Sequence, residues 1–550
     1  MLKIALFSHD KRGSRFWLLL GVLLATTAQA DITDWGYTVQ PGDTLIGVSK
    51  NYLANPKDWQ KIKAANKIKN DRQIPPGSQM RIPIGLLKRE PLQAEVIRVQ
   101  GNAEAIPAQG GAPFALEAGR TLNMGDQIHT GEGSNLTLRF TDGSRLMLLE
   151  KSHLTLEAMT AYGKSGIINT RSRLNSGQVE TQATPLKGPA ARYEVITPTI
   201  AVGVRGTNFR ISVDEDAKVS RSEVLEGEVT AEAVGTQLSV PAGFGTMAEA
   251  GKAPIPPKVL LQGPDLSGVS TLLQRVPLRF KWAAMEGATS YRAQVFADPA
   301  LQNLLLDGTF QGNEAKWADL PDGNYMLRVR AIDAQGLEGM NTDKAFKLKA
   351  RPEPPFVSAP TNKGKLYGDK AGFEWTRSTQ AESYHLQIAS DVAFAKLATD
   401  IADVKDVQYT ATLAPGEYYW RISSRIPGDE GPFSDTQLFT LKPIPAAPVA
   451  SAPKISDTQM EFQWSAGEEG QKYQFQMARD KDFKDIHTDQ TLTKPHITLP
   501  KPGAGDYFMR IKAIDPDGFA GPFSATQQIQ VPRNIPWWLI IPVLLFPLVP

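Results

Sequence analysis

The residue types that most often carry out acid–base or metal chemistry are sparse in this 550-residue chain. It has no cysteine, which excludes disulfides, thiolate metal sites and cysteine nucleophiles. No two histidines show the i, i+4 spacing of a zinc-binding helix, and no acidic residues flank them at ligand spacing. There is no G-x-S-x-G turn or phosphate-binding Gly-Lys loop, and Asp214 and Asp216 fall in a polar turn. We therefore expect no enzymatic activity, no metal ion and no cofactor.

One stretch, residues 37–83, has instead the pattern of a small binding module. Tyr37–Val39 predicts a strand, and Asp43 follows a Pro-Gly turn in the N-cap position of a helix. A second helix is predicted after Asn55-Pro56, with Asn55 as its cap. Apolar residues recur at helical spacing in both segments, at Leu45, Val48 and Tyr52 and then at Trp59, Ile62 and Ala65. Asn66 suits a left-handed C-cap, and Met80 and Ile82 alternate as a closing strand.

This order of elements, with YTVQPGDTL at its start and IPPGSQMRIP at its close, resembles a LysM domain over residues 35–84. The resemblance implies binding of glycans rich in N-acetylglucosamine, which in a bacterial envelope means peptidoglycan. It also implies a groove between two loops, where backbone groups and apolar walls contact a neutral sugar. The implied contacts are Gly42, Asp43, Thr44 and Leu45 on one loop and Asn70, Arg72 and Ile74 on the other. Alternatively, Asp43 only caps a helix, Leu45 only packs, and the module has lost its ligand. A single copy is expected to bind weakly.

Residues 93–250 have a β pattern throughout. Leu136, Leu138 and Phe140 share one face of a predicted strand, and an Asp-Gly turn at 142–143 leads to the next strand. Five segments resemble the FecR family in the family's order: GDQIHTG at 125–131, FTDGS at 140–144, ITP at 196–198, VRGTNF at 204–209 and LEGEV at 225–229. The resemblance implies a periplasmic β domain, which in the founding members relays a signal to a cytoplasmic sigma factor.

This chain departs from those members in one respect. They carry a cytoplasmic segment before a membrane helix, whereas here only fifteen residues precede the apolar run 16–25. An anti-sigma role is therefore the alternative rather than the first hypothesis. Within VRGT, Gly203 and Gly206 suit a bulge or a close backbone approach. Arg205 between them is then either held inside the domain or available to bind a partner.

Three repeats of about ninety residues follow, and they resemble fibronectin type III domains at 258–350, 353–443 and 446–532. In every copy a Trp precedes a Tyr by nine residues, and a second Tyr follows 34 residues later. The Trp residues are Trp282, Trp375 and Trp464. Because these aromatics alternate in step with apolar neighbours, we expect them in the core of each sandwich rather than on a carbohydrate platform. The length suits separate sandwich domains that act as spacers.

Both ends of the chain contain uncharged apolar runs. Residues 1–30 combine a positive front, a short apolar run and Ala28-Gln29-Ala30, which predicts a signal peptide cleaved before Asp31. The alternative is an uncleaved anchor. Residues 535–550 are uncharged, shorter than a typical spanning helix and interrupted by proline. We expect this tail to form a weak membrane anchor or a re-entrant hairpin, with a docking strand for a partner or a tail packed on a neighbouring domain as alternatives.

Together these patterns predict a mostly β, multidomain protein exported to the periplasm or cell envelope. The formal net charge of +2 gives no field for binding nucleic acid. The expected partner is peptidoglycan, with another envelope protein as a possible second partner. The expected role is a non-catalytic scaffold or sensor that presents a FecR-like domain.

Overall fold

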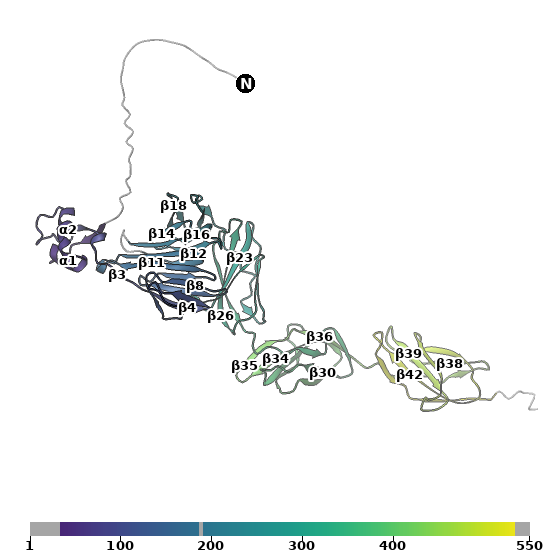
Figure 1. Cartoon of the computed structure of the whole chain (residues 1–550). Coiled ribbons are helices and arrows are strands. Elements are labelled where there is room, and N and C mark those ends of the chain that lie inside the picture. The colour runs from purple at the N-terminus through teal and green to yellow at the C-terminus, as the bar shows by residue number, and fades with distance from the viewer. Residues whose placement is uncertain (1–33, 186–190, 534–550) are drawn as a thin grey trace, which may run out of the picture. The chain divides into compact units, whose positions relative to one another are not determined.

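A computed structural model describes residues 34–185 and 191–533, and it confirms the mostly β, multidomain architecture (Figure 1). The predicted signal peptide and the hydrophobic tail lie outside the described residues. The chain divides into two compact units, residues 1–348 and 349–550, which are treated separately below. Among the described residues, no helix is long and apolar enough to cross a membrane.

The N-terminal module has the predicted order of strand, helix, helix and strand. Strand β1 (Asp34–Thr38) pairs antiparallel with β2 (Gln79–Pro83). Between them lie α1 (Leu45–Tyr52), the 3₁₀ turn η1 (Pro56–Asp58) and α2 (Trp59–Ala65). The buried residues include Leu45, Val48, Ile62, Met80 and Ile82, as the periodicity predicts. Ala65, which the same periodicity places on the buried side of α2, is exposed.

The predicted caps of the module are partly wrong. Asn55 caps η1, as expected, by accepting from the amide of Lys57. The cap of α1 is Thr44 rather than Asp43, because the Thr44 hydroxyl accepts from the Gly47 amide at 3.0 Å. Asn66 ends α2 without a left-handed conformation, which the next residue, Lys67, adopts instead (φ +50°).

The middle of the chain forms a closed barrel of eighteen strands, β3 to β20. The bounds of the first ten are β3 Glu90–Pro91, β4 Ala94–Gln100, β5 Ala103–Ile106, β6 Phe114–Ala115, β7 Thr121–Leu122, β8 Gln127–Thr130, β9 Asn135–Phe140, β10 Arg145–Leu148, β11 His153–Ala161 and β12 Ile168–Gln182. The others are β13 Arg192–Ile196, β14 Ala201–Val204, β15 Asn208–Val213, β16 Val219–Glu226, β17 Glu228–Ala233, β18 Thr236–Pro241, β19 Phe244–Glu249 and β20 Lys258–Val259.

The hydrophobic core of the barrel contains the alternating residues that the sequence singles out. Leu136, Leu138 and Phe140 of β9 are buried, and Leu138 pairs with Leu146 across the predicted Asp-Gly turn. Gly143 in that turn has φ +86°, which a residue with a side chain rarely adopts. The long strand β12 joins the two sides of the barrel, because it pairs with β11 and β13 early and with β10 and β15 late.

Each repeat is a two-sheet sandwich. The first repeat pairs β22 (Leu278–Lys281) with β25 (Glu314–Trp317), and its larger sheet contains β21 Leu272–Leu273, β27 Thr342–Leu348, β26 Gly323–Asp333, β23 Ala288–Phe296 and β24 Leu304–Phe310. The second contains β28 Val357–Ala359, β29 Gly364–Tyr367, β30 Lys370–Trp375, β31 Ser383–Ala389, β32 Leu397–Val404, β33 Gln408–Thr412, β34 Gly416–Ile426, β35 Asp429–Phe433 and β36 Gln437–Lys442. The third contains β37 Lys454–Ile455, β38 Gln459–Gln463, β39 Lys472–Ala478, β40 Ile486–Leu492, β41 His496–Pro500, β42 Gly505–Ile514, β43 Ala520–Phe523 and β44 Gln527–Val531.

The repeated aromatics are core residues, as predicted. Each Trp is at most 5% exposed and lies edge-on against the first Tyr of its repeat at 5.5–5.7 Å: Trp282–Tyr291, Trp375–Tyr384 and Trp464–Tyr473. The second Tyr closes a turn by donating its hydroxyl hydrogen to a carbonyl four residues earlier: Tyr325 to Pro321, Tyr418 to Ala414 and Tyr507 to Gly503. These rings are therefore committed to the sandwich and are not a sugar-binding surface.

The first repeat lies in the same compact unit as the barrel and packs directly on one of its faces. Phe296 and Leu304 of the repeat share a hydrophobic cluster with Met147 and Leu149 of β10 and its following turn. Next to that cluster, the guanidinium of Arg330 contacts the Glu180 carboxylate at 2.6 Å and also pairs with Glu338. Arg210 of β15 donates to the carbonyl oxygens of Glu338 and Gly339, both at 2.7 Å. A buried ionic network therefore joins the two.

Candidate functional site

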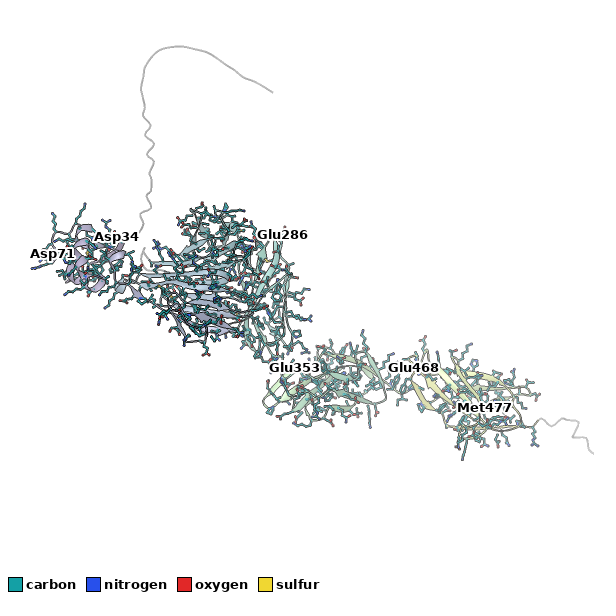
Figure 2. All side chains as sticks on the ribbon, in the orientation of Figure 1. Asp34, Asp71, Glu286, Glu353, Glu468 and Met477 are labelled. Atoms are coloured by element: carbon teal, nitrogen blue, oxygen red, sulfur yellow. The ribbon has the colours of Figure 1, made fainter. Side chains whose placement is uncertain are left out.

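The two loops that the sequence singles out lie side by side in the N-terminal module. The backbone amide of Leu45 donates to the carbonyl oxygen of Asp71 at 3.1 Å, and this bond joins the first loop to the second. Asp71 is held in turn by the Lys63 ammonium at 2.9 Å (Figure 2 labels Asp71 in this loop and Asp34 on β1). That pairing lowers the pKa of the Asp71 carboxyl.

Several candidate residues of the first loop already have structural partners. The Asp43 carboxylate accepts from the Tyr37 hydroxyl at 2.6 Å and from the Gln40 amide at 2.7 Å. Burial and the contact with Asp43 raise the pKa of Tyr37. Thr44 caps α1, and the side chain of Leu45 is fully buried. Gly42 is exposed, with open space around it and φ +87°, so its backbone is accessible on the loop surface.

The second loop borders a shallow hollow of about 370 Å³. Asn70 and Ile74 line it, whereas Gly42, Asp43, Thr44, Leu45 and Arg72 do not. Asn70 shapes the loop by accepting from the Arg72 amide at 3.0 Å, and the Arg72 side chain is exposed. The structure thus brings the seven candidates to two adjoining features, the junction between the loops and this hollow.

Sequence reasoning missed Asn66, Ser78 and Gln79, which also line the hollow. Asn66 was expected only to end α2, but its side chain also bonds the backbone of β2. It donates to the carbonyl oxygen of Arg81 at 2.6 Å and accepts from the Arg81 amide at 2.7 Å. An Asn at a helix end gives no signal for such a long-range bond. The exposed Ile46, 43% accessible in the first turn of α1, was also missed as an apolar surface near the loops.

The opposite end of α1 contacts the barrel. Lys88, in the segment that leads to β3, donates its backbone amide hydrogen to the Tyr52 carbonyl oxygen at 2.8 Å. Ile167 and Ala191, which directly precede the barrel strands β12 and β13, lie in the module's hydrophobic core. An eight-residue helix is about 12 Å long. The candidate loop at the N-terminal end of α1 is therefore separated from the barrel contact by the length of the helix.

In the barrel, the VRGT segment is shaped by one close approach. Gly206 has φ +104°, and a Cβ there would lie 2.6 Å from the Cα of Pro185. Gly203 lies in the regular strand β14 and shows no such crowding. Arg205 is exposed, and it has an interaction partner within the chain. Gly206 is therefore required for close backbone packing. The binding of a partner by Arg205 stays a prediction.

The described residues contain no group of three or more His, Asp or Glu that could hold a metal ion. His129 and His153 do come together across β8 and β11, with ring centroids 4.0 Å apart. Burial and the neighbouring ring lower the pKa of His153. Their stacked arrangement is a packing contact between two neighbouring strands.

Comparison with known families identifies two segments of the chain. Residues 37–83 match the LysM domain, and residues 126–230 match the FecR protein family. A curated protein of Deinococcus radiodurans, described as uncharacterized, is 38% identical over 60 residues. That match covers 11% of this chain and 24% of the relative, so the chain spans about a quarter of the curated relative's length.

Three solved structures resemble parts of the chain, with low TM-scores. The FN1–FN3 domains of chicken CNTN1 are 16% identical with a TM-score of 0.24, covering 50% of this chain and 99% of that one. The fibronectin(III)-like modules of Clostridium thermocellum CbhA are 12% identical with a TM-score of 0.22, covering 32% and 93%. A candidate anti-sigma factor from Parabacteroides distasonis is 12% identical with a TM-score of 0.21, covering 24% and 59%.

Proposed function

We propose that this protein is a non-catalytic component of a bacterial cell envelope that binds peptidoglycan through residues 37–83. In this proposal its FecR-like barrel acts as a scaffold or sensor held at the wall. The observation that supports it most is the LysM match over a module whose paired loops lie at the end of α1 away from the barrel. LysM domains bind glycans of the peptidoglycan and chitin type, and they need no metal or catalytic group to do so.

The direct test is sedimentation of the purified protein with purified peptidoglycan sacculi. The full chain is expected in the pellet, and a chain lacking residues 31–85 is expected in the supernatant. Equal recovery of both chains in the supernatant would refute the proposal. Because the deletion uncovers Ile167 and Ala191 of the barrel, a point variant is needed as well.

The double variant Asn70→Ala/Arg72→Ala supplies that second measurement. Both residues lie in the loop beside the hollow, and Arg72 is exposed. We expect a severalfold weaker affinity for sacculi, with unchanged binding for Lys57→Ala, an exposed residue of η1 outside both loops. If the double variant and the control bind alike, the ligand does not contact this loop.

The FecR match supports a second function, regulation of trans-envelope signalling of the anti-sigma type. That role requires a segment that reaches the cytoplasm. N-terminal sequencing of the protein from envelope fractions distinguishes the two functions. A chain beginning at Asp31 supports the scaffold or sensor, whereas retention of residues 1–30 supports the regulator.

A further inference from the structure

Two adjoining hollows on the barrel share a single row of side chains. One, of about 330 Å³, lies between the barrel and the first repeat, and the other, of about 420 Å³, lies on the barrel alone. Both are lined by Arg145, Gln182, Asn208 and Glu226. These four residues are direct partners across β10, β12, β15 and β16: Arg145 pairs with Gln182, Gln182 with Asn208, and Asn208 with Glu226. Directly paired residues project from the same face of a sheet, which aligns Arg145, Gln182 and Asn208. The register of β15 and β16 shifts between Asn208 and Phe209, but the hydrogen bond between the Asn208 and Glu226 side chains shows that Glu226 extends the same row.

The neighbouring row on the same face shows why this one is accessible. Two residues further along each of the first three strands lie Met147, Glu180 and Arg210, which are covered by the first repeat. The first repeat borders the open row with four residues that line the hollow between the repeat and the barrel. They are Leu301, Gln302, Met340 and Asn341. Thr184, Pro185 and Thr207 border the other side. The result is a groove with a polar floor and partly apolar walls.

The charges along the floor are placed at its two ends. Arg145 is half-buried, and no described residue forms a hydrogen bond or ion pair with its guanidinium. The other two arginines of the lining are engaged, Arg328 with Asp343 and Arg210 with the first repeat. At the far end, the exposed Glu226 accepts from the Asn208 amide group through one carboxylate oxygen, at 2.5 Å. Its second oxygen has no hydrogen-bond donor among the described residues.

The spacing of these charges defines a ligand. Three steps between neighbouring strands separate Arg145 from Glu226, or about 14 Å. An extended peptide of four residues spans about 13 Å. Between the charged ends, the side-chain amides of Gln182 and Asn208 can bond peptide groups. We propose that this groove binds a short zwitterionic peptide, with its carboxylate at Arg145 and its ammonium group at Glu226.

The proposal does not depend on glycan binding by residues 37–83, and it leaves two sources for such a peptide. One is the peptide part of peptidoglycan, which carries free carboxylates and amines. The other is a short peptide released from a protein. Both offer the same chemistry to the groove, so the experiment includes one probe of each kind.

Isothermal titration calorimetry of the full chain with tetra-alanine, its C-terminal amide, its N-acetyl form and a tetrapeptide released from peptidoglycan tests the proposal. We expect binding of tetra-alanine to weaken about fivefold or more on capping either end. Tighter binding of the wall tetrapeptide would assign the ligand to the wall, and equal binding would assign it to short peptides in general.

Variants of the two charged ends link each cap to its residue. In Arg145→Gln, amidation of the carboxylate is expected to have no further effect, whereas acetylation still weakens binding. Glu226→Gln is expected to show the reverse. Arg98→Gln, which changes an exposed arginine of β4 outside the groove, should bind like the unchanged protein. The proposal is overturned if no tetrapeptide binds, or if capping weakens binding to both charge variants as much as to the unchanged protein.

Discussion

At the scale of single residues, the glycine that recurs near the end of each repeat has a steric cause. In each repeat a backbone carbonyl of the segment entering the sandwich approaches this glycine, and a Cβ would lie less than 3 Å from that oxygen. The three pairs are Gly339 with Leu261, Gly431 with Pro352 and Gly521 with Pro445. Since the neighbour is backbone, it cannot move aside as a flexible side chain would.

Gly431→Ala is therefore expected to destabilise the second repeat by about 1–3 kcal/mol, the usual cost of overpacking. Gly372→Ala is the matched control, because a Cβ at Gly372 in β30 meets nothing within 4 Å. Hydrogen exchange measured by mass spectrometry over β34 and β35 reports the local stability. Equal exchange rates in the two variants would contradict this steric explanation.

Glu223 provides a prediction of pH dependence. Burial raises the pKa of its carboxyl above the ordinary 4.5, and nearby Glu338 adds to the rise while Arg210 opposes it. The folded state therefore holds a proton that the unfolded state has already lost. This stabilising contribution is complete below pH 4.5 and is lost as the pH rises through the raised folded pKa.

Glu223→Gln removes this titration. The free energy of unfolding of the variant minus that of the unchanged protein should therefore be larger, meaning a relatively more stable variant, at pH 8 than at pH 5. Urea unfolding at the two pH values measures both differences. The glutamine keeps an oxygen that can accept from the Glu338 amide, which Glu223 does at 3.3 Å. A relative stability that does not change with pH would show that Glu223 is ionised throughout.

The residue scale also shows what sequence patterns resolve. The spacing of Leu45, Val48 and Ile62 predicts the two helices, because burial imposes a helical period. It does not distinguish Asp43 from Thr44 as the cap, since both residue types accept from a free amide and only the local backbone decides. Arg145 and Glu226 are 81 positions apart in the sequence, and only the pairing of four strands places them in one row.

At the scale of elements, the same sheet face has different roles in the three repeats. Five positions after the second Tyr, on the same strand, the first repeat has Arg330 where the other repeats have Ser423 and Lys512. On the strand after the Trp, it has Phe296 where they have Ala389 and Ala478. Arg330 and Phe296 both pack against the barrel. This difference was visible in the sequence, but an alignment of repeats does not indicate which surface would cover the exceptional residues.

Arg330→Met is expected to cost about 3–5 kcal/mol, because it leaves Glu180 and Glu338 without their buried partner. Arg330 and Arg210 outweigh the effect of burial on Glu180 and lower the pKa of its carboxyl to about 2. Lys512→Met, at the equivalent position of the third repeat, should change stability by less than about 1 kcal/mol. Denaturant unfolding of each variant measures the difference, and equal midpoints would contradict a stabilising role for this network.

At the scale of the whole molecule, the contacts of the first repeat change its expected role from spacer to part of the barrel unit. The sequence predicts three similar sandwiches, because the anchors and their spacing are the same in each. The second and third repeats lie in the other compact unit and keep the expected arrangement of sandwiches in tandem. Any movement of the first repeat would open the peptide groove, since its loops form one wall.

A chain that ends at residue 260, just after the last barrel strand β20, tests whether the barrel is complete without the first repeat. The truncation would expose Met147 and Leu149, and it would leave the Glu180 and Arg210 charges without their partners across the interface. We expect its barrel to unfold at a lower denaturant concentration than the barrel of a chain ending at residue 350, which retains the repeat. Hydrogen exchange over β10, β12 and β15 measures the barrel in both chains. If these strands exchange equally slowly without the repeat, the barrel is an independent domain and the buried ionic network only positions the wall of the groove.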